Sequence, residues 1–168
     1  MGCGKSSIGR KLSELLCCRF VDLDDEIEER AGRSIPEIFS MEGEPYFRNL
    51  EKETLTDLIR TNSSEGSEES VRLILALGGG AIMTPECEKI VHEDTTCIYL
   101  MASVDTLISH LEGQASGRPL LNSVSSLREH ITNMMSKRAA TYERTAHMII
   151  DTDGKSIDEI ALYLYKSF

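Results

Sequence analysis

The chain opens with MGCGKSS, which holds glycines, a lysine and hydroxyl groups at the spacing of a phosphate-binding loop. Gly4, Lys5 and Ser6 fill the last three places of the pattern G-x-x-x-x-G-K-[ST]. Glycines let a backbone curl so that its N–H groups face phosphate, and the start of the following helix adds a positive field. We therefore expect Lys5 to reach the outer phosphates of a nucleotide and Ser6 to ligate Mg²⁺. The alternative is a glycine-rich start to an ordinary helix.

Two carboxylates, Asp22 and Asp24, follow a short apolar run in RFVDLDD. We expect this run to be a strand, and the carboxyl end of a parallel strand is where such sheets bind ligands. Residues two apart on a strand share a face, so both carboxylates would point the same way. One could then assist Mg²⁺ while the other accepts a hydroxyl proton. The alternative is N-capping of the next helix by Asp24 or Asp25.

Three consecutive glycines, Gly78, Gly79 and Gly80, end the apolar stretch LILAL. Without side chains they let a ligand approach the backbone N–H groups closely. A tight turn between a strand and a helix needs one glycine and rarely three. The run therefore indicates a binding site at the end of a second strand.

Three isolated arginines lie on expected helices or loops: Arg48 in YFRNLE, Arg118 in GRPLL and Arg138 in SKRAATY. The planar fork of a guanidinium suits a carboxylate or a phosphate group. The alternative for any one of them is a solvated surface charge.

Strands and helices are expected to alternate along the chain. Apolar runs predict four strands, at 19–23, 73–77, 95–102 and 147–152, and helical spacing of apolar residues predicts helices at 6–16, 25–32, 34–43, 44–60, 84–93, 103–111, 127–146 and 156–168. This alternation implies an α/β fold with a parallel sheet and helices on both faces. The polar stretches 61–70 and 112–126 are expected to be loops.

Composition narrows the possible partners and compartment. The 168 residues suit one domain, and no apolar run approaches the ~20 residues of a membrane span. The net charge of -10 argues against nucleic acid or an anionic membrane as a main partner. The five cysteines form no C-x-x-C pair and no metal-ligand spacing with the histidines, which indicates reduced thiols in a cytosol-like compartment. We expect no signal peptide, because the start lacks a basic and then apolar leader.

Six motifs occur in a fixed order: GxGKS, VDLDD, IFxxxGExxFRxxE, LGGGA, RPLL and KRxxxY. This arrangement resembles the shikimate kinases, small P-loop kinases of the nucleoside monophosphate kinase fold, from residue 1 to about residue 155. The resemblance implies a single three-layer α/β/α domain over residues 1–168, with substrate-binding helices at about 32–61 and a mobile lid at about 112–125. It also implies a parallel sheet of five strands, of which the first is missing from this sequence.

The resemblance further implies that ATP phosphorylates the 3-hydroxyl of shikimate, giving shikimate 3-phosphate and ADP, in a cytoplasmic and often monomeric enzyme that uses Mg²⁺. The implied residues are Lys5, Asp24 and Arg118 for catalysis; Gly2, Cys3, Gly4, Lys5, Ser6, Ser7 and Arg118 for the phosphates; Asp24, Phe39, Phe47, Arg48, Glu51, Gly78, Gly79, Gly80 and Arg138 for shikimate; and Ser6 and Asp22 for the metal. In the family pattern, Asp24 holds the substrate hydroxyls and orients or deprotonates the one that is phosphorylated. Arg48 and Arg138 bind the substrate carboxylate, and Glu51 positions an arginine.

Two alternatives stay open. One is another small-molecule P-loop kinase of the gluconate kinase type, and the other is a non-catalytic kinase-like binding protein. The paired arginines Arg48 and Arg138 with Asp24 favour a carboxylated ring over gluconate. The sequence departs from the family pattern before Arg118, where SHLEGQ offers His110 in place of an arginine that stacks on adenine.

The phosphate loop has no strand in front of it in this sequence, although such loops connect a buried strand to a helix. In the family fold that strand lies in the sheet interior, and its loss would leave neighbouring strands with unpaired backbone groups. We therefore expect an apolar strand, ending in a glycine and one more residue, to precede Met1.

Overall fold

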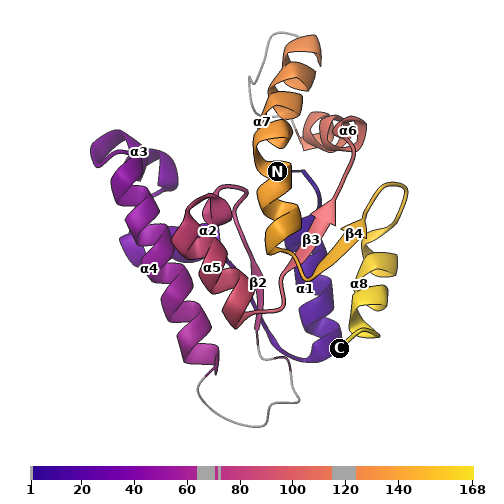
Figure 1. Cartoon of the computed structure of the whole chain (residues 1–168), viewed down its shortest axis with the longest axis horizontal. Helices are drawn as coiled ribbons and strands as arrows, with labels where there is room; N and C mark the ends of the chain where they lie inside the picture. The colour runs from indigo at the N-terminus through magenta and orange to yellow at the C-terminus, as the bar shows by residue number, and fades with distance from the viewer. Residues whose placement is uncertain (1, 64–70, 72, 115–123) are drawn as a thin grey trace.

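The computed structural model describes residues 2–63, 71, 73–114 and 124–168, in which helices and strands alternate as predicted (Figure 1). The elements are α1 (Lys5–Leu16), β1 (Arg19–Asp22), α2 (Leu23–Ala31), α3 (Ile35–Met41), α4 (Glu44–Ser63), β2 (Leu73–Ala76), the 3₁₀ turn η1 (Ala81–Met83), α5 (Pro85–Asp94), β3 (Ile98–Met101), α6 (Val104–Gln114), α7 (Val124–Thr145), β4 (Met148–Asp151) and α8 (Ile157–Tyr165). None of the described helices is both long and apolar enough to cross a membrane.

The strands form two parallel pairs instead of one continuous sheet. β1 pairs with β2 in the register Arg19 to Leu73, and β3 pairs with β4 in the register Ile98 to Met148. Within the described ranges, no strand joins β2 to β3, so each pair is a separate two-stranded sheet. Both inner strands run in the same direction, since β2 and β3 each rise from the lower to the upper part of the view (Figure 1). The prediction of parallel strands is confirmed, and the sheet is interrupted in its middle.

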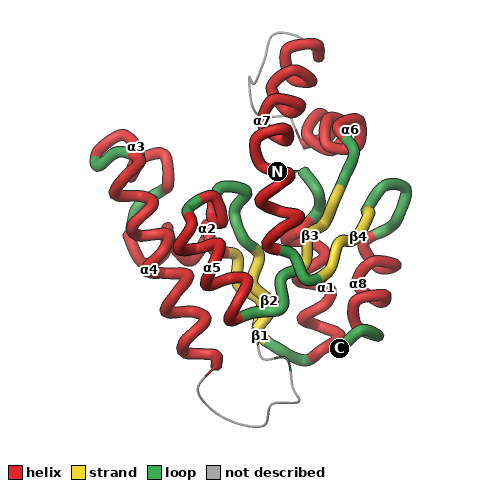
Figure 2. Tube along the Cα trace, viewed as in Figure 1, coloured by secondary structure: helices red, strands yellow, loops and turns green. Residues whose placement is uncertain are grey.

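Helices cover both faces of the strands, which gives three layers (Figure 2). On one face, α1 and α8 pack against β2, β3 and β4 through Ile8, Leu12, Ile150, Ile160 and Leu164. On the other face, α2, α4 and α5 pack against β1 and β2; this larger core includes Val21, Leu23, Ile27, Leu55, Leu58, Cys87 and Val91. A third cluster, Leu107, Ile108 and Ile131, joins α6 to α7. Burial of these apolar side chains is the main stabilising contribution.

Helix boundaries follow local sequence signals. Ser34 and Glu37 form a capping box at the start of α3, which has a proline in its first turn. Gly32 ends α2 in the left-handed conformation with φ 61°. The helices α3 and α4 that follow form an arm beside α2, as Figure 1 shows.

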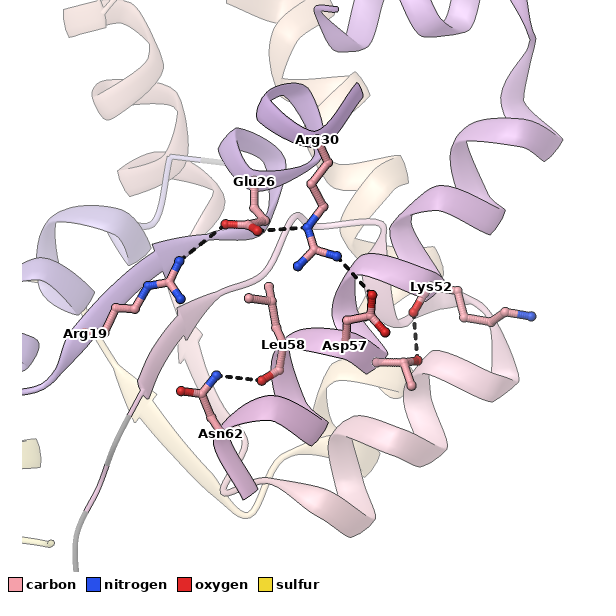
Figure 3. Close-up of polar contacts among 8 residues, drawn as sticks. Arg19, Glu26, Arg30, Lys52, Asp57, Leu58 and Asn62 are labelled. Atoms are coloured by element: carbon pink, nitrogen blue, oxygen red, sulfur yellow. Dashed lines mark hydrogen bonds and ion pairs between the residues drawn. The ribbon is translucent and has the colours of Figure 1, made fainter. Parts of the chain in front are cut away.

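Ion pairs link β1, α2 and α4 at the surface. Glu26 forms an ion pair with Arg19 at 3.6 Å and accepts a hydrogen bond from Arg30 at 2.8 Å, and Arg30 also donates to Asp57 at 3.1 Å (Figure 3). Pairs as exposed as these contribute little, about 0–1 kcal/mol each. The pair of Arg30 with Asp57 connects α2 to α4, two helices that both carry residues of the site described next.

Candidate active site

The phosphate loop leads directly into α1. Gly2 and Gly4 have φ angles of 78° and 77°, a left-handed conformation that side chains rarely adopt. Gly4 is the N-cap of α1 and has no side chain that could cap the N–H groups of the first turn. The first N–H groups of a helix lack partners within the helix and attract anions. Both glycines thus curl the backbone ahead of α1, and the binding of phosphate by this loop stays a prediction.

Lys5, Ser6 and Asp22 form one polar cluster between α1 and the end of β1. Ser6 Oγ donates to Asp22 Oδ2 at 2.6 Å, and Lys5 Nζ lies 3.6 Å from the same oxygen. The Asp22 side chain is only 10% exposed, whereas that of Lys5 is 31% exposed. The cluster thus places a cation and two hard oxygen donors beside the N-terminus of α1.

Asp24 lies on a helix, so the prediction that it shares a strand face with Asp22 is wrong. β1 ends at Asp22, and α2 begins at Leu23. The capping residue is Asp22, because its Oδ1 accepts from the backbone N–H of Asp24 at 3.2 Å. Burial raises the pKa of the Asp24 carboxyl, the charge of Asp22 raises it further, and Lys5 opposes both.

The glycine run after β2 lies against three site residues. A Cβ atom added at Gly78 would lie 2.8 Å from Asp24 Oδ1, and one added at Gly80 would lie 2.8 Å from Arg48 Nη1. At Gly79 an added Cβ would lie 3.2 Å from Arg138 Nη1. Asp24, Arg48 and Arg138 come from α2, α4 and α7, and this run is where the fold brings them together. The sequence predicted that these glycines let a ligand approach the backbone. In the structure the side chains of Asp24, Arg48 and Arg138 lie close to them, and the approach of a ligand stays a prediction.

Arg48 is held by two glutamates of its own helix. Its Nη1 donates to Glu51 Oε2 at 2.8 Å, and its Nη2 donates to Glu44 Oε1 at 3.1 Å. Glu51 is 2% exposed, and burial raises the pKa of its carboxyl while Arg48 opposes the shift. Phe47 packs on Phe39 with ring centroids 4.7 Å apart, and the guanidinium of Arg48 lies 5.3 Å from the Phe47 ring. These contacts bring together four of the predicted substrate residues, namely Phe39, Phe47, Arg48 and Glu51.

Arg138 is half-buried and, among the residues that the structure describes, forms no ion pair with a carboxylate. Tyr142 lies one turn further along α7 and donates from its hydroxyl to the Gly79 carbonyl at 2.5 Å. Tyr142 is the tyrosine of the KRxxxY motif, to which the sequence assigns no role. Its spacing of four residues from Arg138 was the available signal, because such residues share a helix face.

His110 is a second residue that sequence reasoning did not place. Its Nδ1 lies 2.6 Å from the Gly2 carbonyl, so this nitrogen donates and anchors the phosphate loop to α6.

Cys3 packs against the α6–α7 cluster beside Leu107 and Leu111. Ser7 is exposed on the first turn of α1. Arg118 and the central part of the expected lid, 115–123, lie outside the described residues.

The structure combines a parallel α/β fold with a glycine loop that leads into a helix. A lysine and a hydroxyl lie at the start of this helix, and a carboxylate and arginines complete the candidate site. Together these features define a P-loop kinase of small molecules. Residues 1–168 match the family model described as shikimate kinase. A shikimate kinase of Dictyoglomus turgidum is 37% identical over 95% of this chain and 88% of its own length, and one of Thermus thermophilus is 39% identical over 95% and 81%. The chain belongs to the shikimate kinase family.

Solved structures agree with the sequence relatives. Shikimate kinase from Acinetobacter baumannii, in complex with shikimate, is similar with a TM-score of 0.83 and 30% identity. The similarity covers 99% of this chain and 87% of that one. The predicted fold and the predicted activity class, an ATP-dependent kinase, are thereby confirmed, and neither alternative from the sequence finds support in these relatives.

Proposed function

We propose that the site of this chain transfers a phosphoryl group from ATP to the 3-hydroxyl of shikimate, giving shikimate 3-phosphate and ADP. The observation that carries this proposal is the grouping of Asp24, Arg48 and Arg138 around Gly78–Gly80. A carboxylated polyol requires arginines for its carboxylate and a carboxylate to accept its hydroxyl protons. Phosphoryl transfer depends mainly on positioning and charge neutralisation, which the phosphate loop beside this group supplies.

At the phosphate end, Gly2, Cys3, Gly4 and Ser7 would contribute backbone around the ATP phosphates, and Lys5 would neutralise their charge. Uncapped N–H groups at the start of α1 support this role. Arg118 would close over the phosphates from a lid at about residues 112–125, as the family pattern implies.

Ser6 and Asp22 would hold the metal ion, and we propose that this ion is Mg²⁺. Hydroxyl and carboxylate oxygens are the donors that Mg²⁺ prefers, and it often takes few protein ligands beside substrate phosphates. The two oxygens lie 2.6 Å apart, so both can reach one ion. When bound, the metal would neutralise charge on the phosphate oxygens.

At the acceptor end, Asp24 would accept the proton of the hydroxyl that is phosphorylated. Its raised pKa makes it a better proton acceptor than an ordinary aspartate, provided that the pH keeps it ionised. Arg48 and Arg138 would bind the substrate carboxylate, with Glu51 fixing Arg48 at 2.8 Å. Phe39 and Phe47 would pack beside the ring, within substrate-binding helices at about residues 32–61.

The test is ADP release by the purified chain with ATP and Mg²⁺ in three parallel reactions, with shikimate, with gluconate and without an acceptor. We expect release that depends on shikimate. A preference for gluconate would indicate another small-molecule kinase, and ATP binding without turnover would indicate a binding protein. We also propose that the protein is a monomer and lies in the cytoplasm. Sedimentation of the same sample tests the first proposal, and cell fractionation tests the second.

A further inference from the structure

The side chain of Tyr142 joins α7 to the glycine run after β2. Its hydroxyl donates to the Gly79 carbonyl at 2.5 Å. A Cβ atom added at Gly79 would lie 3.2 Å from the Tyr142 hydroxyl and also 3.2 Å from Arg138 Nη1. Tyr142 and Arg138 are four residues apart on α7, so they lie on one face of this helix. Two side chains of one helix face thus meet the same glycine, and one of them holds it with a hydrogen bond.

The ring of Tyr142 is packed on two sides. It lies against Tyr99 of β3 with ring centroids 5.3 Å apart, and it also packs against the core of α2, α4 and α5. Because the hydroxyl lies on the axis of the ring, packing that fixes the ring also fixes the hydroxyl. A tyrosine hydroxyl in such a place usually finds a hydrogen-bond partner, and here the partner is the Gly79 carbonyl. The bond therefore ties the glycine run to a fixed point on α7.

The two arginines proposed to bind the substrate carboxylate differ in what orients them. Arg48 donates to Glu51 and Glu44 of its own helix at 2.8 and 3.1 Å. Arg138 is half-buried and has no such carboxylate among the residues that the structure describes. The place of its guanidinium therefore depends on how α7 lies against the glycine run. The Tyr142 bond, one helical turn away, is a direct polar link between that helix and the run.

Two arginines can share one carboxylate only when their guanidinium groups lie at a matching separation. Arg138 lies against Gly79 and Arg48 lies against Gly80. Neighbouring Cα atoms are about 3.8 Å apart, so both guanidinium groups reach the same short piece of backbone. We propose that Tyr142 is a positioning residue for the substrate carboxylate. By holding the Gly79 carbonyl, it sets the separation of Arg138 from Arg48 that one carboxylate bridges. This inference rests on the proposed function, in which these two arginines bind the carboxylate of shikimate.

The test removes only the Tyr142 hydroxyl, with Tyr142→Phe, and measures shikimate binding by calorimetric titration. Phenylalanine keeps the ring and its packing, so the variant should fold, and thermal unfolding checks that it does. We expect the Kd for shikimate to rise about fivefold, as for the loss of one hydrogen bond, because Arg138 is no longer held in place. In steady-state kinetics the KM for shikimate should rise by the same factor, while the KM for ATP should change by less than about twofold.

A double-mutant cycle separates this role from a general loosening of the fold. An Arg138→Ala chain has no guanidinium left to place, so Tyr142→Phe in that chain should change the Kd for shikimate by less than about twofold. Equal effects of Tyr142→Phe in the parent and in the Arg138→Ala chain would overturn the proposal. An unchanged Kd for the Tyr142 variant of the parent chain would overturn it as well.

Two further variants complete the comparison. Tyr99→Phe removes the hydroxyl of the ring that packs on Tyr142, and it should leave the Kd for shikimate within about twofold of the parent value. 4-Aminophenylalanine at position 142 keeps the ring and supplies an N–H donor, so it should restore the parent Kd to within about twofold.

A Kd that stays raised with this restored donor, or that rises as much in the Tyr99 variant, would contradict the role of the Tyr142 bond. A parent chain that binds no shikimate would overturn the proposed function and this inference with it. All the other contrary outcomes overturn this inference alone, so the two failures are distinguishable.

Discussion

Ser6 donates a hydrogen bond of 2.6 Å to Asp22, which joins the first turn of α1 to the end of β1. Asp22 also caps α2, the helix that carries Asp24. One carboxylate thus links the phosphate loop to the residue proposed to activate the acceptor.

Replacing Asp24 by Asn should lower turnover about 100-fold or more, because the amide cannot accept the hydroxyl proton. Steady-state kinetics with shikimate and ATP measure the effect. Asp25→Asn is the matched control, since Asp25 is the exposed neighbour on the same helix turn. Near-normal turnover of the Asp24 variant would remove this residue from its proposed role.

The pH dependence of activity should follow the raised pKa of Asp24. The ionised form is the proton acceptor, so kcat/KM should fall as the pH drops through a value above the pKa of an ordinary aspartate.

The contribution of Asp24 to the stability of the folded chain should change with pH in the opposite direction. A raised folded pKa contributes stability below the unfolded pKa and loses it as the pH rises through the folded pKa. Asp24→Asn should therefore be more stable than the parent chain at neutral pH, with the advantage vanishing in acid. A pH series of thermal unfolding in both chains tests this, and a constant difference would contradict it.

Gly78→Ala should impair catalysis without unfolding the protein. The added methyl group would lie 2.8 Å from Asp24 Oδ1 and would displace that carboxylate. A displacement of about 1 Å at a reacting group can lower the reaction rate by up to roughly 100-fold. We therefore expect kcat/KM to fall about 10- to 100-fold. Circular dichroism and unfolding temperature should stay close to those of the parent. Unchanged kinetics would show that Asp24 has room to move.

Replacing Arg48 should destabilise the folded protein more than replacing Arg138. Arg48→Ala leaves Glu51, which is 2% exposed, without its partner, so the free energy of unfolding should fall by about 3 kcal/mol. Arg138→Ala breaks no ion pair among the described residues and should cost much less. Both variants should lower kcat/KM for shikimate by about 30-fold or more, as for loss of one preorganised charged donor. Urea unfolding and kinetics measure the two effects, and equal loss of stability would contradict the assignment.

His110→Ala should weaken ATP binding, because the His110 side chain holds the Gly2 carbonyl. One hydrogen bond is worth about 1 kcal/mol, so the KM for ATP should rise about fivefold while the KM for shikimate changes little. His130→Ala, an exposed position on α7, is the control. A larger effect on shikimate than on ATP would show that the bond does not act through the phosphate loop.

Local patterns predicted the elements well and their contacts less well. Apolar spacing placed all four described strands and the helices between them. The position of Asp24 was missed because a strand pattern was extended past Asp22, where capping by Asp22 and the acidic first turn favour a helix instead. The bonds from His110 to Gly2 and from Tyr142 to Gly79 join residues far apart in sequence, so no local pattern encodes them.

The strand β2 belongs to two apolar cores at once. Leu73 and Leu75 pack with the core of α2, α4 and α5, whereas Ile74 packs with the core of α1 and α8. The first core supports the proposed acceptor residues Asp24 and Arg48, and the second supports the helix that follows the phosphate loop. One short strand thus joins the support of the donor to that of the acceptor, so a change in its packing would reach both.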